Sequence, residues 1–271
     1  MISYDFQAGT YREAYEKDSE LHEIKDAYNR NIANVINSFS CSVESILEAG
    51  VGEATALVPI LKYLKRDEIR WIGGNDISYS RIKVAKEFAR DYGAENINLF
   101  VADIFNMPIS SDSIDVVYTC HALEPNGGFE HELLNELYRI ARKYIVLVEP
   151  DFENANLEAR KRMEYHGYVK GLADIARSNG WDVVVDQPVP IALNSQNPSK
   201  MIVIKKNCKN DVREKSSVFA CPITHKALEL VGNAYYSHEG MLAYPIVNDI
   251  PCLRKENAIL ATKMQQSGVR I

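Results

Sequence analysis

One short run, residues 45–55, constrains the fold more than any other part of the chain. Its sequence, SILEAGVGEAT, starts as an apolar strand that ends in an acid, then turns on small residues and predicts a helix start. Glycines at 50 and 52 let the backbone approach a ligand closely, because no Cβ stands in the way. The run therefore predicts a strand–turn–helix unit with a ligand at the turn.

The turn differs from the glycine pattern that binds dinucleotides. Thr55 stands at the third glycine position of that pattern, and Glu48 lies two residues before the first glycine. A carboxylate there repels a diphosphate on the helix N-terminus but attracts an ammonium group. The sequence favours a ligand in which an amino acid is joined to a nucleoside.

From residue 44 onward, predicted strands alternate with predicted helices. Expected strands are Ser45–Ala49, Arg70–Asn75, Ile97–Ala102, Ile114–Thr119, Tyr144–Glu149, Trp181–Asp186 and Met201–Lys205, and expected helices are Ala54–Leu64, Ser78–Tyr92 and Glu130–Arg142. Such alternation builds an α/β fold with a Rossmann-like sheet, flanking helices and ligands at the carboxyl ends of the strands. We expect four segments: an N-terminal helical cap over 1–43, the main domain over 44–206, a polar linker over 207–216 and a small β-rich domain over 217–271.

Acidic side chains follow three successive predicted strands. Glu48 ends the first, Asp76 follows the second and Asp103 follows the third. Any one of them could simply cap the next helix, but three at strand ends favour a shared site. Asp76 can accept hydrogen bonds from a ribose diol and Asp103 from an exocyclic amine.

Residues 44–205 resemble the class I S-adenosylmethionine-dependent methyltransferases. The resemblance rests on EAGVGEAT at 48–55, on Asp76, on VADI at 101–104 and on SIDVVYTCHALE at 113–124, with Ala54 where many members carry a third glycine. It implies S-adenosylmethionine as cofactor, with Gly50, Gly52 and Glu48 at its methionine part, Asp76 at the ribose, and Ile77, Asp103 and Ile104 at the adenine. The expected cofactor-binding set also includes Ala49 and Cys120 from these motifs and Tyr15 from the N-terminal segment, where family members often fold a helix over the cofactor; Tyr4 and Tyr11 are alternatives.

Candidate catalytic residues lie on the expected rim of the site. His121 follows the fourth strand and can titrate near neutral pH, although a histidine at a strand end can equally be a structural hydrogen bonder. Glu124 lies in a loop beside the substrate position, or is a solvated loop acid. His166, within EYHGY at 164–168, suits a substrate lid or marks a packed helix kink.

The C-terminal segment resembles the Trm112-like (UPF0434) small domain. Where zinc-binding relatives carry two C-x-x-C knuckles, this chain keeps only Cys221, with Thr224 second and no cysteine in SHEG at 237–240. We expect no metal, and a possible homodimer through this segment. The five scattered cysteines favour free thiols in the cytoplasm, and the chain has no membrane-spanning apolar run.

Three functions remain open at this point. The chain's net charge of −6 is uneven: residues 1–204 carry −10 (21 Lys/Arg against 31 Asp/Glu) and 205–271 carry +4 (10 against 6), so the main domain is a poor match for nucleic acid. This favours a methyltransferase acting on a hydroxyl or amine of a small metabolite or sugar-like molecule. The alternatives are an enzyme acting on RNA or a translation protein with its activator fused in cis, and a non-catalytic scaffold.

Overall fold

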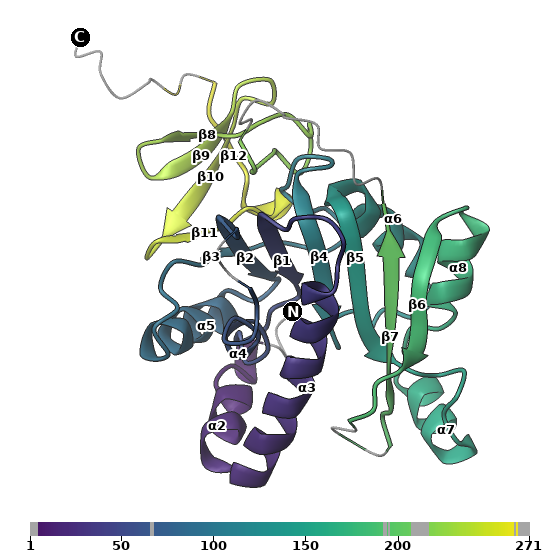
Figure 1. Cartoon of the computed structure of the whole chain (residues 1–271). Helices are drawn as coiled ribbons and strands as arrows, with labels where there is room; N and C mark the ends of the chain where they lie inside the picture. The colour runs from purple at the N-terminus through teal and green to yellow at the C-terminus, as the bar shows by residue number, and fades with distance from the viewer. Residues whose placement is uncertain are drawn as a thin grey trace.

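The structure is a computed structural model that describes residues 5–65, 68–191, 194, 196–206, 217–262 and 264. A seven-stranded sheet, in the order β3-β2-β1-β4-β5-β7-β6, lies between two layers of helices (Figure 1). Its strands are β1 (Ser45–Ala49), β2 (Trp71–Asp76), β3 (Asn98–Val101), β4 (Ile114–Cys120), β5 (Ala141–Pro150), β6 (Asp182–Pro188) and β7 (Ser199–Lys205). The expected Rossmann-like α/β fold is confirmed.

The helices largely occupy the expected places. They are α2 (Thr10–Lys17), α3 (Ser19–Asn37), α4 (Leu57–Ile60), α5 (Tyr79–Asp91), α6 (Glu130–Ile140), α7 (Leu157–Tyr165) and α8 (Leu172–Ser178). The helix expected over Ala54–Leu64 is much shorter in the structure. Ala54 extends the turn with a φ of 60°, and Pro59 removes one backbone donor from the following segment.

Strand direction explains how distant parts of the chain meet at one edge of the sheet. The neighbours β3, β2, β1, β4 and β5 run parallel, so their carboxyl ends share an edge. The strand β7 runs antiparallel between β5 and β6, and its first residue Ser199 pairs with Pro150 at the end of β5. The amino end of β7 therefore lies at the same edge as the ends of β1 to β5.

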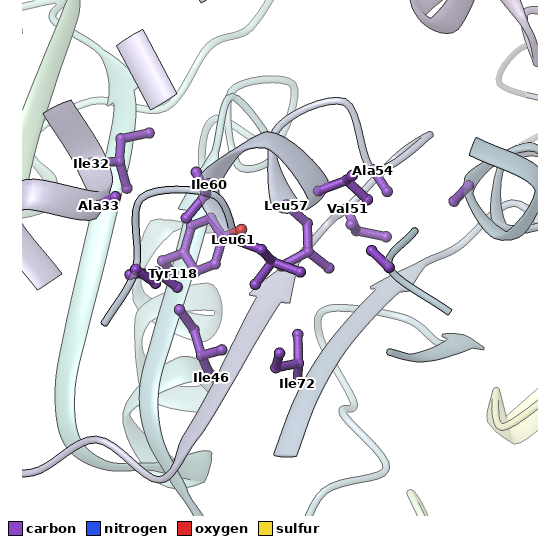
Figure 2. Close-up of a cluster of buried hydrophobic side chains, with 14 of the residues drawn as sticks. Ile32, Ala33, Ile46, Val51, Ala54, Leu57, Ile60, Leu61, Ile72 and Tyr118 are labelled. Atoms are coloured by element: carbon purple, nitrogen blue, oxygen red, sulfur yellow. The ribbon is translucent and has the colours of Figure 1, made fainter. Parts of the chain in front are cut away.

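A hydrophobic core fills each face of the sheet. On one face, α3 presents Ile32 and Ala33 toward Ile46 of β1 and Tyr118 of β4, all fully buried (Figure 2). Burying a side chain such as Ile32 contributes about 1.5–3 kcal/mol. The second core joins the opposite face to α6, and it also includes Tyr244 from the C-terminal segment.

The C-terminal segment packs on the β3 edge of its own chain. It contains β8 (Glu229–Val231), β9 (Ala234–Ser237), β10 (Leu242–Val247), β11 (Ile250–Pro251), a 3-10 turn (Lys255–Asn257) and β12 (Ile259–Leu260). Leu253 donates its backbone N–H to Val101 at 2.8 Å, and Phe219 packs edge-on against Phe100. Since this segment shares the second core, 217–262 and the sheet are packed as one body; the expected linker over 207–216 lies outside the described residues.

The cysteines differ in part from expectation. Cys120, Cys221 and Cys252 are free thiols, but Cys41 is disulfide-bonded, so the expectation of free thiols is wrong for Cys41. The buried Cys221 thiol lies 3.2 Å from the Tyr244 hydroxyl and accepts from the Thr224 N–H at 3.4 Å. Among the described residues, no three His, Cys, Asp or Glu side chains converge on a common metal position.

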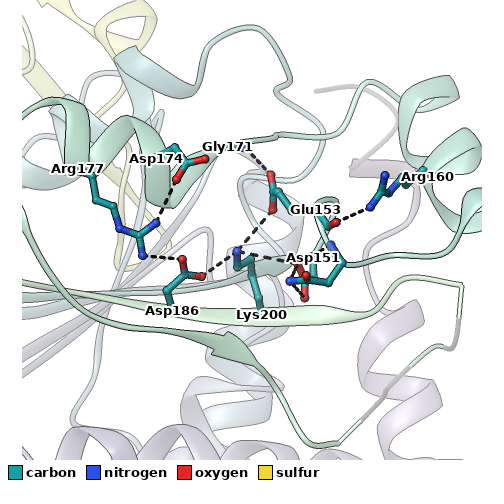
Figure 3. A network of polar contacts seen from close by, with 9 residues as sticks. Asp151, Glu153, Arg160, Gly171, Asp174, Arg177, Asp186 and Lys200 are labelled. Carbon is teal, nitrogen blue, oxygen red and sulfur yellow. Dashed lines mark hydrogen bonds and ion pairs between the residues drawn. The ribbon is translucent and has the colours of Figure 1, made fainter.

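A polar network fastens α7, α8 and the connecting segment to the far edge of the sheet (Figure 3). The side chain of Lys200 of β7 is only 9% exposed, and its ammonium lies 2.8 Å from Asp186 and 3.5 Å from Glu153. Arg177 of α8 bonds the same Asp186 at 2.8 Å, and Glu153 accepts from the Gly171 N–H at 2.6 Å. The network fixes the segment that carries His166 beside the site.

None of the described helices is both long and apolar enough to cross a membrane.

Candidate functional site

Two adjoining cavities lie at the carboxyl ends of the strands. The first cavity, of about 630 Å³, is lined by strand-end and loop residues that include Asn75, Asp76, Ile77, Asp103, Ile104, His166 and Tyr168. The second cavity, of about 280 Å³, lies between the glycine turn and α3, and its lining includes Lys25, Tyr28, Glu48, Gly52, Cys120 and Asn197. Gly50, Arg81, His121 and Glu124 line both, so a ligand bridging the cavities would pass these residues.

The glycine turn needs its small residues for both conformation and space. Gly50 has a φ of 79°, and a Cβ placed on it would lie 2.3 Å from the Cβ of Ala122. Gly52 has a φ of 54° and donates its N–H to Asp76 at 3.1 Å. A side chain at either position would be strained, and at 50 it would also push away the loop after β4. The turn therefore holds β1, β2 and β4 close together.

Polar groups of the first cavity match a nucleoside. Asp76 is 9% exposed and accepts from the Ser78 N–H at 2.8 Å; burial raises the pKa of its carboxyl. The buried Oδ1 of Asn75 has no hydrogen-bond partner among the described residues. Asp103 accepts from the Phe105 N–H at 3.0 Å and lines the same cavity. Such acceptors suit a ribose diol and an exocyclic amine.

Glu48 supplies a buried acid to the second cavity. It is 2% exposed and accepts a hydrogen bond from the Tyr118 hydroxyl at 2.7 Å. Burial raises the pKa of Glu48 to about 8. An ammonium group entering the cavity would favour the ionised carboxylate.

His121 stands at the centre of a hydrogen-bonded cluster on the wall between the cavities. Its Nδ1 lies 3.0 Å from Glu124, and its Nε2 lies 2.8 Å from the Ser199 hydroxyl and 3.2 Å from the Tyr28 hydroxyl. Asn197 donates to the same Glu124 oxygen at 3.1 Å. Burial opposes a charge on the ring, but the hydrogen bond with Glu124 and nearby carboxylates raise the pKa of His121 overall.

Glu149 holds the loop that carries His121. This residue at the end of β5 is fully buried and accepts from the N–H groups of Ala122 and Leu123 at 3.1 and 3.2 Å. Burial raises its pKa to about 7. His121 has a φ of 54°, a conformation that costs energy in a residue other than glycine, and the two bonds to Glu149 stabilise it.

The N-terminal segment docks on the glycine turn through backbone N–H groups at the start of α2. Glu53 accepts from the N–H groups of Gly9 and Arg12 at 2.9 and 2.7 Å, so its carboxylate caps the start of α2. Tyr15 is fully buried in the core and lines neither cavity, whereas Tyr11 lines the second. Of the three tyrosines, the structure places Tyr11 and not Tyr15 on a cavity wall, and Tyr4 lies outside the described residues.

Most of the expected site residues are brought together. Glu48, Gly50, Gly52, Asp76, Ile77, Asp103, Ile104, Cys120, His121, Glu124 and His166 line one or both cavities. Ala49 is buried in the second core and lines neither cavity. Sequence reasoning missed Lys25, Tyr28 and Asn197, which come from segments outside the strand-end motifs. Glu149 was missed too, although it also ends a predicted strand.

Comparisons with known proteins agree with this geometry. Residues 46–144 match the methyltransferase domain family. The fold is similar to magnesium protoporphyrin IX methyltransferase from Synechocystis PCC 6803 with bound S-adenosylhomocysteine, at 13% identity and a TM-score of 0.57, over 76% of this chain and 99% of that one. It is also similar to a putative sarcosine dimethylglycine methyltransferase from Galdieria sulphuraria (14% identity, TM-score 0.51, 68% and 86% covered). A geranyl diphosphate methyltransferase with S-adenosylmethionine gives 9% identity and a TM-score of 0.54, over 69% and 87%. A search of curated proteins gave no match.

The methyltransferase domain matched over residues 46–144 and the methyltransferase fold of the sheet support an S-adenosylmethionine-dependent methyltransferase. The residues that line the two cavities fit this cofactor. Hydrogen-bond acceptors line the first cavity, and a buried acid lines the second. The cofactor expected from the sequence is S-adenosylmethionine, and the comparisons support it.

Proposed function

We propose that the protein transfers the methyl group of S-adenosylmethionine to a hydroxyl or amine of a small molecule. The observation that carries this proposal is the position of the His121–Glu124 pair. Both side chains line both cavities, and their atoms lie 3.0 Å apart. A base at this point would stand beside an acceptor that enters next to the cofactor.

When bound, the cofactor supplies an activated methyl group on a sulfonium. The protein then has to align the acceptor and take up its proton. The carboxylate of Glu124 orients the ring of His121 and stabilises the imidazolium that forms. The proton of the acceptor would go to Nε2, directly or through the Tyr28 hydroxyl, which lies 3.2 Å from that nitrogen and lines the second cavity.

A small acceptor suits the charge of the domain better than a nucleic acid does. The acidic side chains outnumber the basic ones over 1–204, and nucleic-acid binding depends on Lys and Arg contacts to phosphates. The similar structures are named for tetrapyrrole, amino-acid and terpenoid substrates. The likeness of the C-terminal segment to a Trm112-like domain, and a homodimer through it, stay predictions.

A methyl-transfer assay tests the proposal. Labelled S-adenosylmethionine is incubated with the protein and a panel of small hydroxyl and amine compounds, with RNA as a parallel arm. His121→Gln should lower the rate by about a hundredfold or more, while His131→Gln, an exposed histidine on α6, should leave it unchanged. Transfer to RNA alone, or equal rates in both variants, would contradict the proposal.

A further inference from the structure

An amide oxygen on the wall of the second cavity lacks a hydrogen-bond partner. Asn197, just before β7, lines this cavity and is only 9% exposed. Its Nδ2 donates to Glu124 at 3.1 Å, whereas its Oδ1 is buried and has no partner among the described residues. A buried carbonyl without a donor costs free energy, and a bound ligand can supply that donor.

The orientation of the Asn197 amide follows from its neighbour. A carboxylate only accepts hydrogen bonds, so the NH2 of the amide has to face Glu124 and the amide oxygen has to face away from it. The backbone N–H of Asn197 donates to Asn194 at 3.0 Å, and the carbonyl of Pro198 accepts from the Asp151 N–H at 2.7 Å. These bonds hold the segment beside the end of β5, so the amide oxygen is a fixed acceptor.

The same Glu124 oxygen places Asn197 beside His121. The Nδ1 of His121 lies 3.0 Å from this oxygen, so Nδ1 carries the proton of the neutral ring and Nε2 is its basic nitrogen. Both residues line the second cavity. They therefore offer two neighbouring acceptors with different roles: the amide oxygen can only hold an N–H or O–H group, whereas the imidazole nitrogen can also remove its proton.

We propose that the methyl-accepting group is a neutral primary amine, which donates one N–H to the Asn197 amide oxygen and the other to the His121 base. The proposal rests on the proposed function, since it assumes methyl transfer at this site. A primary amine has two N–H groups and one lone pair, so it can pair with both acceptors and still direct the lone pair at the methyl group. A hydroxyl has a single proton, so one of the two acceptors would stay unpaired.

The transfer step is balanced within the site. The nitrogen lone pair forms the new N–C bond while the C–S bond breaks, and the electron pair of that bond stays on the sulfur. The proton of one N–H moves to Nε2 of His121, and the N–H on Asn197 remains. The product is a secondary amine with one N–H left. It cannot pair with both acceptors, so it should be a poor substrate for a second transfer.

Amino alcohols test the choice of acceptor directly, because they carry both groups in one molecule. The protein is incubated with labelled S-adenosylmethionine and a panel that runs from 2-aminoethanol to amino sugars, and mass spectrometry locates the label in each product. Every product should carry a single new methyl group on nitrogen. The N-methylated analogues should react at least about tenfold more slowly than the primary amines. A label on oxygen, or secondary amines that react as fast as primary ones, would overturn the proposal.

Two variants assign the preference to Asn197. Asn197→Leu is close in size and lacks the acceptor, so kcat/KM for primary amines should fall by about tenfold to hundredfold, and the preference over secondary amines should disappear. Its affinity for S-adenosylhomocysteine should stay within about twofold of wild type, which separates this role from an effect on folding. Asn96→Leu changes an exposed asparagine before β3 and should match wild type throughout.

The outcomes separate this inference from the proposed function. An unchanged preference for primary amines in Asn197→Leu would overturn the role of Asn197. Transfer by wild type to hydroxyl groups alone would overturn the primary amine but keep a small-molecule methyltransferase. If wild type transfers methyl groups to neither amines nor hydroxyls, the proposed function fails and this inference fails with it.

Discussion

Proton release on ligand binding is the sharpest consequence of the buried acid at the end of β1. Burial raises the pKa of Glu48 to about 8, so at pH 7 most ligand-free molecules carry a proton on this carboxyl. Binding of an ammonium group would favour the carboxylate. S-adenosylhomocysteine should therefore release most of a proton, and at most one, per molecule bound at pH 7.

Calorimetry in two buffers of different ionisation enthalpy measures that number. The binding constant of wild type should rise with pH, by up to about tenfold per unit below pH 8. Glu48→Gln should release no proton and lose this pH dependence, while Glu20→Gln, an exposed acid of α3, should behave as wild type. Wild type that binds the ligand without releasing a proton would refute the role of Glu48.

The same pKa fixes the sign of a stability effect. A carboxyl whose pKa is raised on folding stabilises the protein fully below its unfolded pKa, about 4.3, and this contribution is lost as pH rises through about 8. Glu48→Gln cannot ionise. Relative to wild type, the ligand-free variant should gain thermal stability between pH 5 and pH 9, and a constant difference in Tm would contradict the raised pKa.

Three further predictions follow from other parts of the structure. Asp76→Asn should weaken binding of both S-adenosylhomocysteine and 5′-methylthioadenosine by about 1.5–3 kcal/mol, since both carry the ribose, and unchanged calorimetric affinities would remove Asp76 from the site. With an acceptor found, the rate should rise with pH through an apparent pKa above 6.5, because His121 must lose its proton to act as a base and its pKa is raised; a rate that falls over this range would contradict that role. Lys200→Met should lower the free energy of unfolding by about 1–3 kcal/mol in urea titrations, because it leaves Asp186 and Glu153 without their shared cation, and an unchanged midpoint would show that the network adds no stability.

Local spacing explains why much of the fold and cofactor site could be predicted from the sequence. A strand that ends in a polar residue brings that residue to one edge of a parallel sheet. The sequence alone therefore predicts that Glu48, Asp76 and Asp103 lie at a shared site. The same rule applied to β5 would have found Glu149. The helix after the turn is shorter than its sequence predicts because Ala54 adopts a left-handed conformation and Pro59 lacks a backbone donor.

Residues that reach the site through tertiary docking could not be predicted. Tyr11 and Tyr15 have the same chemistry in the sequence, and only the docking of α2 on Glu53 decides which of them lines the cavity. Lys25 and Tyr28 lie on a helix whose rotation against the sheet sets their direction. Ser199 contacts His121 because β7 runs antiparallel, which no motif near Ser199 indicates.

Binding of S-adenosylmethionine to the wild-type protein tests the central claim most directly. Calorimetric titration with S-adenosylmethionine and with S-adenosylhomocysteine should show saturable one-to-one binding of each, in about the micromolar range, and each ligand should compete with the other. A correctly folded protein that binds neither would contradict a live methyltransferase site at the glycine turn.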